Sequence, residues 1–195
     1  RRVRFNEGKV GPEGRFVAGT MDWHEQEALG KLYQLGPDGA VTTLLDGVAI
    51  SNGLDATDDG KALFYIDTPL GGVDVFERDP ATGALSGRRR FVDVPAADGA
   101  PDGMTLDAEG CIWVALWGGG QVRRFDPSGR LIAAVEVPAR QVSSVAFGGD
   151  HLDELFITTA RVGQPQAALS GQPRAGDLFW CSPGVTGRPW PRFAG

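Results

Sequence analysis

A short phrase recurs in this chain, and it limits the folds that the chain can adopt. Residues 51–54 read Ser-Asn-Gly-Leu, and residues 101–104 read Pro-Asp-Gly-Met. Each phrase is followed by an apolar run, an acidic turn that ends in glycine, and a strongly apolar segment at residues 62–67 or 111–117. Repeats built only from strands and turns are typical of propeller blades. The sequence therefore predicts an all-β protein, a β-propeller with four-stranded antiparallel blades.

Two weaker copies extend the pattern toward both ends of the chain. One spans residues 6–20 and the other spans residues 142–159. Aligning the four copies puts Asn6, Asn52, Asp102 and Ser143 at equivalent positions. Because equivalent positions of a propeller converge around its axis, we expect these polar side chains to meet there.

The strands within each block can be read from alternating apolar residues and turn residues. We expect strands at residues 73–78 and 90–94 in one block, and at residues 121–125 and 131–137 in the next. Residues 163–176 are rich in Gly, Pro and Gln and predict a surface loop, and no segment predicts a strong helix. The whole of residues 1–195 reads as one propeller domain. With about four blades, it is either a compact four-bladed ring or part of a larger one.

Composition excludes several classes of function. The 29 glycines and 13 prolines lie at turns between apolar runs, which indicates a turn-rich folded chain rather than a disordered one. A net charge of −6 argues against nucleic acid as a partner, and no apolar run reaches the ~20 residues that span a membrane. Cys111 and Cys181 are expected to be buried free thiols, which favours a cytoplasmic protein. A leader peptide lost before Arg1 remains an alternative.

Five motifs in a fixed order resemble the SMP-30/gluconolactonase/LRE family. They are Arg4–Lys9 (RFNEGK), Gly14–Met21 (GRFVAGTM), Ile50–Leu54 (ISNGL), Pro101–Met104 (PDGM) and Phe147–Gly149 (FGG). The resemblance implies a six-bladed propeller with one divalent metal ion in the central channel and hydrolysis of sugar lactones. Against that pattern the chain is expected to lack the two N-terminal blades, together with a Glu that supplies one metal ligand.

The resemblance also implies roles for particular residues. Asn52 and Asp102 would bind the metal ion, which is calcium, zinc, manganese or magnesium, and Asp102 would assist proton transfer. Arg4 and Asn6 would contact the sugar lactone, and so would Glu25. The neighbouring His24 and Glu27 make the alignment of Glu25 with the family's substrate-contacting Glu less specific. From the residues alone, amide and carboxylate oxygens suit a hard cation, but Asn-Gly and Asp-Gly are also common turn residues.

The most favoured function is metal-dependent hydrolysis of a sugar lactone. A non-enzymatic calcium-binding or interaction propeller is the second reading, and an inactive fragment without the Glu ligand is the third. His24 and His151 are expected at the surface rather than in catalysis. Trp113 and Trp117 share one face of a strand and are expected in the core, with a channel-lining position for one of them as the alternative. Trp23 is expected in a loop over the channel mouth.

Overall fold

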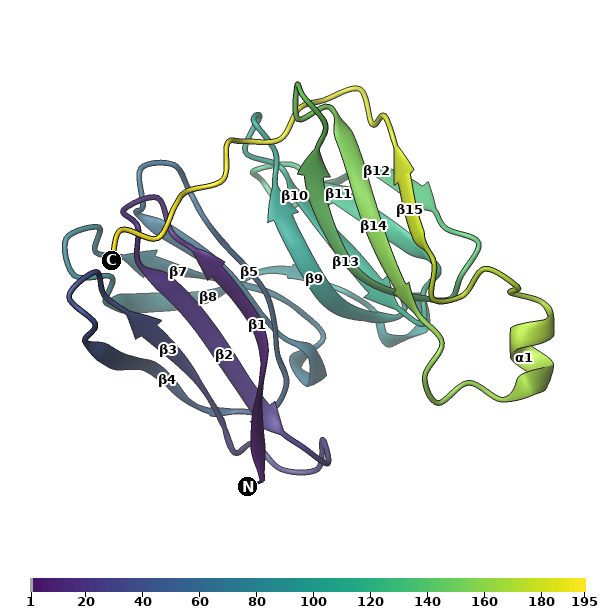
Figure 1. The fold of residues 1–195 in the computed structure, drawn as a ribbon, viewed down its shortest axis with the longest axis horizontal. Coiled ribbons are helices and arrows are strands. Elements are labelled where there is room, and N and C mark those ends of the chain that lie inside the picture. The colour runs from purple at the N-terminus through teal and green to yellow at the C-terminus, as the bar shows by residue number, and fades with distance from the viewer. Residues whose placement is uncertain (1) are drawn as a thin grey trace. The chain divides into compact units, whose positions relative to one another are not determined.

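The computed structural model describes residues 2–195 and confirms an all-β chain of antiparallel strands (Figure 1). Contacts divide the chain into two compact units. Unit 1 contains the residues up to Asp93 together with Pro189–Gly195, and unit 2 is Val94–Arg188. None of the helices within residues 2–195 has the length and hydropathy that crossing a bilayer requires.

Unit 1 contains two four-stranded sheets, in which each strand pairs with the next along the chain. Tight turns join the strands, and glycines with positive φ, such as Gly14 at 78° and Gly60 at 68°, occupy turn positions that other residues adopt at a cost. The first sheet is β1 (Val3–Val10), β2 (Phe16–Asp22), β3 (Gly30–Leu35) and β4 (Val41–Val48). The second is β5 (Ser51–Ala56), β6 (Ala62–Asp67), β7 (Gly72–Arg78) and β8 (Leu85–Asp93).

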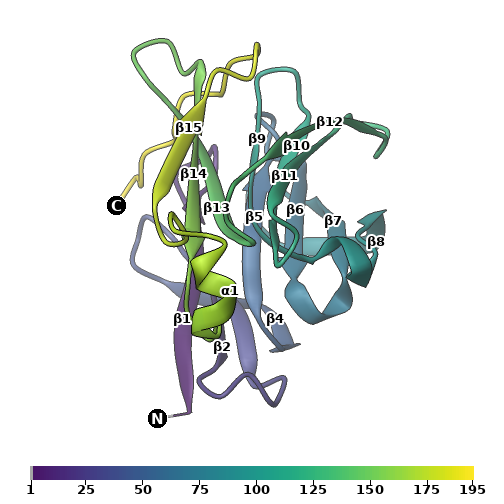
Figure 2. The ribbon, with the colours of Figure 1, turned by 90° about the vertical axis from the view of Figure 1, so that its right-hand side faces the viewer.

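Unit 2 contains a group of four strands and a group of three, joined by the single register pair Trp117–Gln141. The four are β9 (Ala100–Leu106), β10 (Ile112–Trp117), β11 (Gln121–Phe125) and β12 (Leu131–Glu136). The three are β13 (Gln141–Gly148), β14 (Glu154–Ala160) and β15 (Leu178–Cys181), which lie side by side in Figure 2. The group β9–β12 has the four strands of a propeller blade, whereas β13–β15 has three, one fewer than a four-stranded blade. The number of blades in the protein stays a prediction.

Most strands lie where the sequence predicts them. Residues 62–67 and 121–125 match β6 and β11 residue for residue, whereas β8 begins five residues before the predicted start at residue 90. The predicted loop at residues 163–176 contains one short helix, α1 (Gln166–Ser170), beyond the ends of β14 and β15 (Figures 1 and 2). Residues 2–195 also contain two 3₁₀ turns, Thr68–Leu70 and Ala96–Asp98.

Each unit has its own apolar core. In unit 1 the core includes Leu32, Leu54 and Tyr65, and burial raises the pKa of the Tyr65 phenol. In unit 2 Trp113 packs edge-on against Phe147 with ring centroids 6.0 Å apart, so its predicted core role is confirmed.

The cysteines match the expected thiol chemistry only in part. Both Cys111 and Cys181 are free, as expected, but only Cys111 is buried. Cys181 is half-buried because its strand, β15, pairs with β14 alone within the described residues and lies at the edge of the sheet.

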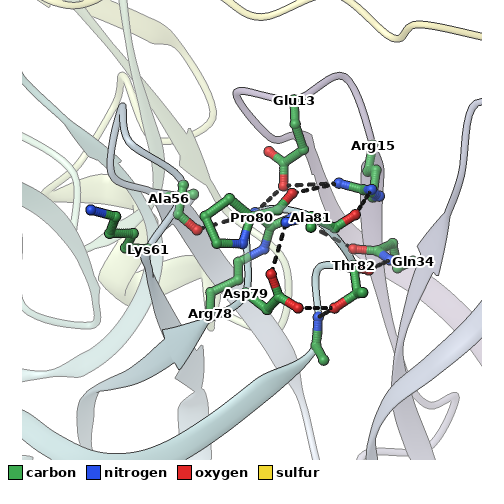
Figure 3. A network of polar contacts seen from close by, with 12 residues as sticks. Glu13, Arg15, Gln34, Ala56, Lys61, Arg78, Asp79, Pro80, Ala81 and Thr82 are labelled. Atoms are coloured by element: carbon green, nitrogen blue, oxygen red, sulfur yellow. Dashed lines mark hydrogen bonds and ion pairs between the residues drawn. The ribbon is translucent and has the colours of Figure 1, made fainter.

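A buried polar network joins the two sheets of unit 1 at one end (Figure 3). The Arg78 guanidinium pairs with the Glu13 carboxylate, and Arg78 Nη1 and Nη2 donate to Gly60 O at 3.3 Å and to Gln34 Oε1 at 3.4 Å. Arg15 donates to Pro80 O at 3.0 Å. Because Arg78 is almost fully buried, the network fixes the β1–β2 turn against the turn after β7.

The last residues of the chain also belong to unit 1. Ala194 N donates to Gly14 O at 3.0 Å, and the Trp190 ring lies 4.9 Å from Lys9 Nζ. Lys9 in turn pairs with the buried Asp55 at 3.0 Å. This segment therefore packs on the β1–β2 hairpin of the first sheet.

Candidate functional site

The four equivalent polar residues of the repeat all lie at β-bulges. In the first sheet Phe5 pairs with Thr20 and Glu7 pairs with Gly19, so Asn6 is an extra residue on β1. The same one-residue excess occurs on β5, β9 and β13, where the pairing shifts at the predicted positions. The four bulge residues are Asn6, Asn52, Asp102 and Ser143. The strand register thus confirms their predicted equivalence, and a bulge is a common way to re-aim a side chain next to a functional site.

In unit 1 a row of hydrogen bonds connects three of the predicted site residues. Arg4 Nη1 donates to Asn6 Oδ1 at 2.7 Å. Asn6 Nδ2 donates to Asn52 Oδ1 at 3.0 Å and to the backbone carbonyl of Ser51 at 2.9 Å. The structure therefore brings Arg4, Asn6 and Asn52 together, although β1 and β5 belong to different sheets of the unit.

Thr68 completes this row and was not predicted from the sequence. Asn52 Nδ2 donates to Thr68 Oγ1 at 2.7 Å, at the start of the 3₁₀ turn that follows β6. This bond fixes the amide of Asn52 so that its Oδ1 faces Asn6. A carbonyl oxygen has two lone pairs, so Oδ1 keeps one acceptor position beyond the bond from Asn6.

Trp23 lies at the other end of the row. The Arg4 guanidinium carbon is 5.8 Å from the centroid of the Trp23 ring, within the range of a cation–π contact. The side chain is 60% exposed and lies in the β2–β3 connection, which confirms that Trp23 is in a loop. Its place over a channel mouth stays a prediction.

Glu25 lies in the same loop but does not join the row. It is exposed, and its φ of 59° is in the left-handed region. Within residues 2–195 no hydrogen bond or ion pair links its carboxylate to Arg4, Asn6 or Asn52. Its role as a substrate contact remains a prediction. His24 and His151 are exposed, as predicted.

Asp102 lies in unit 2, at the bulge of β9, and is half-buried. The residue after it is Gly103, where an added Cβ would lie 2.3 Å from Ser144 Oγ. Glycine is therefore required for the close approach of β9 to β13, which explains the Asp-Gly pair of the repeat. A common ion for Asp102 and Asn52, which lies in unit 1, stays a prediction.

The donor chemistry of these residues fits a hard divalent cation. Calcium and magnesium prefer carboxylate, amide carbonyl and water oxygens, which Asp102 and Asn52 offer together with solvent. Within the described part of the chain, no cluster of three or more His, Cys, Asp or Glu side chains is arranged to hold a metal ion.

The fold and the bulged polar residues define the class as an all-β protein of antiparallel, blade-like sheets. Residues 1–161 match the family described as SMP-30/Gluconolactonase/LRE-like region. The chain belongs to this family.

Individual relatives show how much of the family architecture the chain covers. It is 43% identical over 180 residues to regucalcin of Danio rerio, a match to 91% of this chain and 61% of that protein. A calcium-binding regucalcin of Agrobacterium tumefaciens superposes with a TM-score of 0.93 at 33% identity, over 98% of this chain and 65% of that one. A gluconolactonase of Xanthomonas campestris gives a TM-score of 0.69 at 27% identity, over 90% of this chain and 55% of that one. The chain thus spans about 61% of the Danio rerio relative.

Proposed function

We propose that the protein hydrolyses a sugar lactone to the sugar acid and that Asn52 and Asp102 bind one divalent cation for this reaction. The observation that carries the proposal is the row Arg4–Asn6–Asn52, whose asparagines occupy the bulge positions equivalent to that of Asp102. Family membership and the likeness to a gluconolactonase of Xanthomonas campestris support the reaction type.

The cation would be held by oxygen. Asn52 would supply Oδ1, whose orientation Thr68 fixes, and Asp102 would supply its carboxylate. When bound, a calcium, zinc, manganese or magnesium ion supplies positive charge that polarises the ester carbonyl.

Arg4 would bind the substrate as a hydrogen-bond donor, and Asn6 would bind it as a hydrogen-bond acceptor. Arg4 uses Nη1 for Phe5 O and Asn6 Oδ1, which leaves the N–H groups of Nε and Nη2 to donate to sugar oxygens. Asn6 uses both N–H groups of Nδ2 within the protein and can only accept, through Oδ1. The pair would therefore hold an edge of the sugar that offers both an acceptor and a hydroxyl donor.

Asp102 would act on the attacking water. A carboxylate beside a cation is a poor base, because the positive charge lowers its pKa. Asp102 is therefore expected to orient the water and to assist the transfer of the water proton to the leaving alkoxide. It is not expected to become the protonated acid itself. The half-buried position on a bulge of a rigid strand suits this orienting role.

The test is acid release from D-glucono-1,5-lactone by the purified full-length protein, followed by pH-stat titration with each of the four cations and with a chelator. We expect a rate above the spontaneous one that depends on the added cation and is lost on chelation. A rate equal to spontaneous hydrolysis with every cation would contradict the proposal.

A second candidate is calcium binding without turnover. The calcium-binding regucalcin of Agrobacterium tumefaciens favours it, since that structure superposes over 98% of this chain. Calorimetric calcium binding together with the absence of acid release would support this candidate. An Asp102→Ala variant that binds a protein partner as tightly as the wild type would support it as well. An inactive fragment would show neither calcium binding nor acid release.

Thr68→Val is expected to weaken binding of the cation about tenfold, the low end of the effect of removing a residue that orients a metal ligand. Valine keeps the shape of threonine but cannot accept the hydrogen bond from Asn52 Nδ2, so the amide can rotate. The measurement is calorimetric titration with calcium. Thr68→Ser keeps the hydroxyl and is the matched control, so an equal loss in both variants would contradict the orienting role.

A further inference from the structure

The loop that carries Trp23 is held in place by a buried carboxylate. Asp22, at the end of β2, is 0% exposed, and its Oδ2 accepts from the backbone N–H groups of Gln26 and Glu27, each at 3.2 Å. Burial opposes the charged form, but the backbone hydrogen bonds outweigh it and hold the pKa of Asp22 below its usual range. Trp23 N itself donates to Arg2 O at 2.7 Å. The backbone on both sides of Trp23 is thus fixed.

The Trp23 side chain is nevertheless mostly in solvent. A large aromatic side chain usually buries much of its surface, and here 60% remains exposed. Within residues 2–195 its ring makes no aromatic pair and its indole N–H donates no hydrogen bond, and the Arg4 guanidinium lies beside it at 5.8 Å. A fixed loop that presents an exposed indole next to a cation is suited to binding a ligand rather than to filling a core.

The neighbours of Trp23 indicate which ligand chemistry it would meet. Arg4 leads through Asn6 to Asn52, so the indole is the apolar end of a row whose other members are polar. A cyclic polyol has the matching character, with apolar C–H groups on its ring faces and hydroxyl groups on its edges. Stacking on an aromatic face removes the C–H groups from water, while Arg4 can donate to the ring oxygens.

We propose that Trp23 is the platform on which the ring of the sugar lactone packs, and that it sets the preference for cyclic sugar derivatives over open-chain esters. This inference rests on the proposed lactonase function. Trp23 contacts the substrate away from the reacting carbonyl, so it contributes to binding of the ring and not to the chemical step. The same platform binds the ring of the substrate and of a non-hydrolysable cyclic sugar.

The experiment compares Trp23→Ala and Trp23→Phe with the wild-type protein. For D-glucono-1,5-lactone we expect KM to rise about tenfold in Trp23→Ala with kcat within about twofold, and to recover at least in part in Trp23→Phe. Calcium affinity, measured by calorimetry, is expected to be unchanged. Trp190→Ala is the matched control, because Trp190 is 46% exposed, also lies beside a cation, Lys9, and also belongs to unit 1.

The outcomes separate this inference from the proposed function. If the wild-type protein hydrolyses the lactone and Trp23→Ala leaves KM unchanged, the proposed role of Trp23 in binding the sugar ring is wrong, while the proposed lactonase function stands. An equal rise in KM in Trp190→Ala would mean that the effect is structural, which also overturns the platform. If the wild-type protein neither hydrolyses the lactone nor binds 1,5-anhydro-D-glucitol in calorimetry, both proposals fail.

Discussion

Asp102→Ala is expected to lower kcat/KM for the lactone by about 10²–10³-fold, the loss typical of removing one preorganised charge-stabilising group. Alanine removes the carboxylate that would bind the cation and orient the attacking water. Because Asp102 is half-buried on a bulge outside the regular pairing of β9 with β10, the fold should tolerate the change. The measurement is steady-state hydrolysis with saturating cation, alongside urea unfolding.

Asp102→Asn separates charge from shape. Asparagine keeps the size of the side chain and an oxygen, but it removes the negative charge and the ability to accept a proton. It should therefore be nearly as inactive as Asp102→Ala while unfolding like the wild type. Hydrolysis by either variant within about threefold of the wild-type rate would exclude Asp102 from catalysis.

Asp107→Ala is expected to destabilise unit 2 by about 3–5 kcal/mol, because it removes one member of a buried charged network. The Asp107 carboxylate is 0% exposed. It accepts from Trp113 Nε1 at 2.9 Å, from Arg124 Nε at 2.8 Å, and from the backbone N–H groups of Glu109 at 2.9 Å and Cys111 at 3.0 Å. Alanine leaves all four donors without this acceptor and leaves the largely buried Arg124 guanidinium with Glu109, at 2.6 Å, as its carboxylate partner.

The loss can be measured by urea unfolding and by the reactivity of Cys111. Burial raises the pKa of the Cys111 thiol, so it should react slowly with thiol reagents in the wild type and faster in Asp107→Ala. Asp150→Ala is the control, since Asp150 is an exposed turn residue of the same unit. If Asp107→Ala were no less stable than Asp150→Ala, the network would not be a source of stability.

The sequence predicts those features whose signal is local. The polar-Gly phrase and the acidic-Gly turn recur clearly in the two central blocks and more weakly in the outer two, so most strands and the equivalence of Asn6, Asn52, Asp102 and Ser143 could be read from the sequence. The reason for their equivalence, a bulge on the first strand of each group, depends on the strand register. A one-residue excess in pairing leaves no separate mark in the sequence.

The features that the sequence does not reveal depend on contacts between distant residues. Thr68 contacts Asn52 only because the β5–β6 hairpin brings residues 16 positions apart together. Arg78 pairs with Glu13 across two sheets of unit 1. The anchoring of the loop by Asp22 depends on backbone N–H groups, which every residue but proline carries. No local pattern distinguishes these side chains from solvated ones.

The central claim, that Asn52 and Asp102 bind the same cation, is tested most directly by a double-mutant cycle in calorimetric calcium titrations. The four proteins are the wild type, Asn52→Ala, Asp102→Ala and the double variant. The account predicts that each single replacement weakens binding strongly and that the double variant loses much less than the sum of the two. Losses that add within about 0.5 kcal/mol would contradict it, since independent effects indicate that the two side chains do not share an ion.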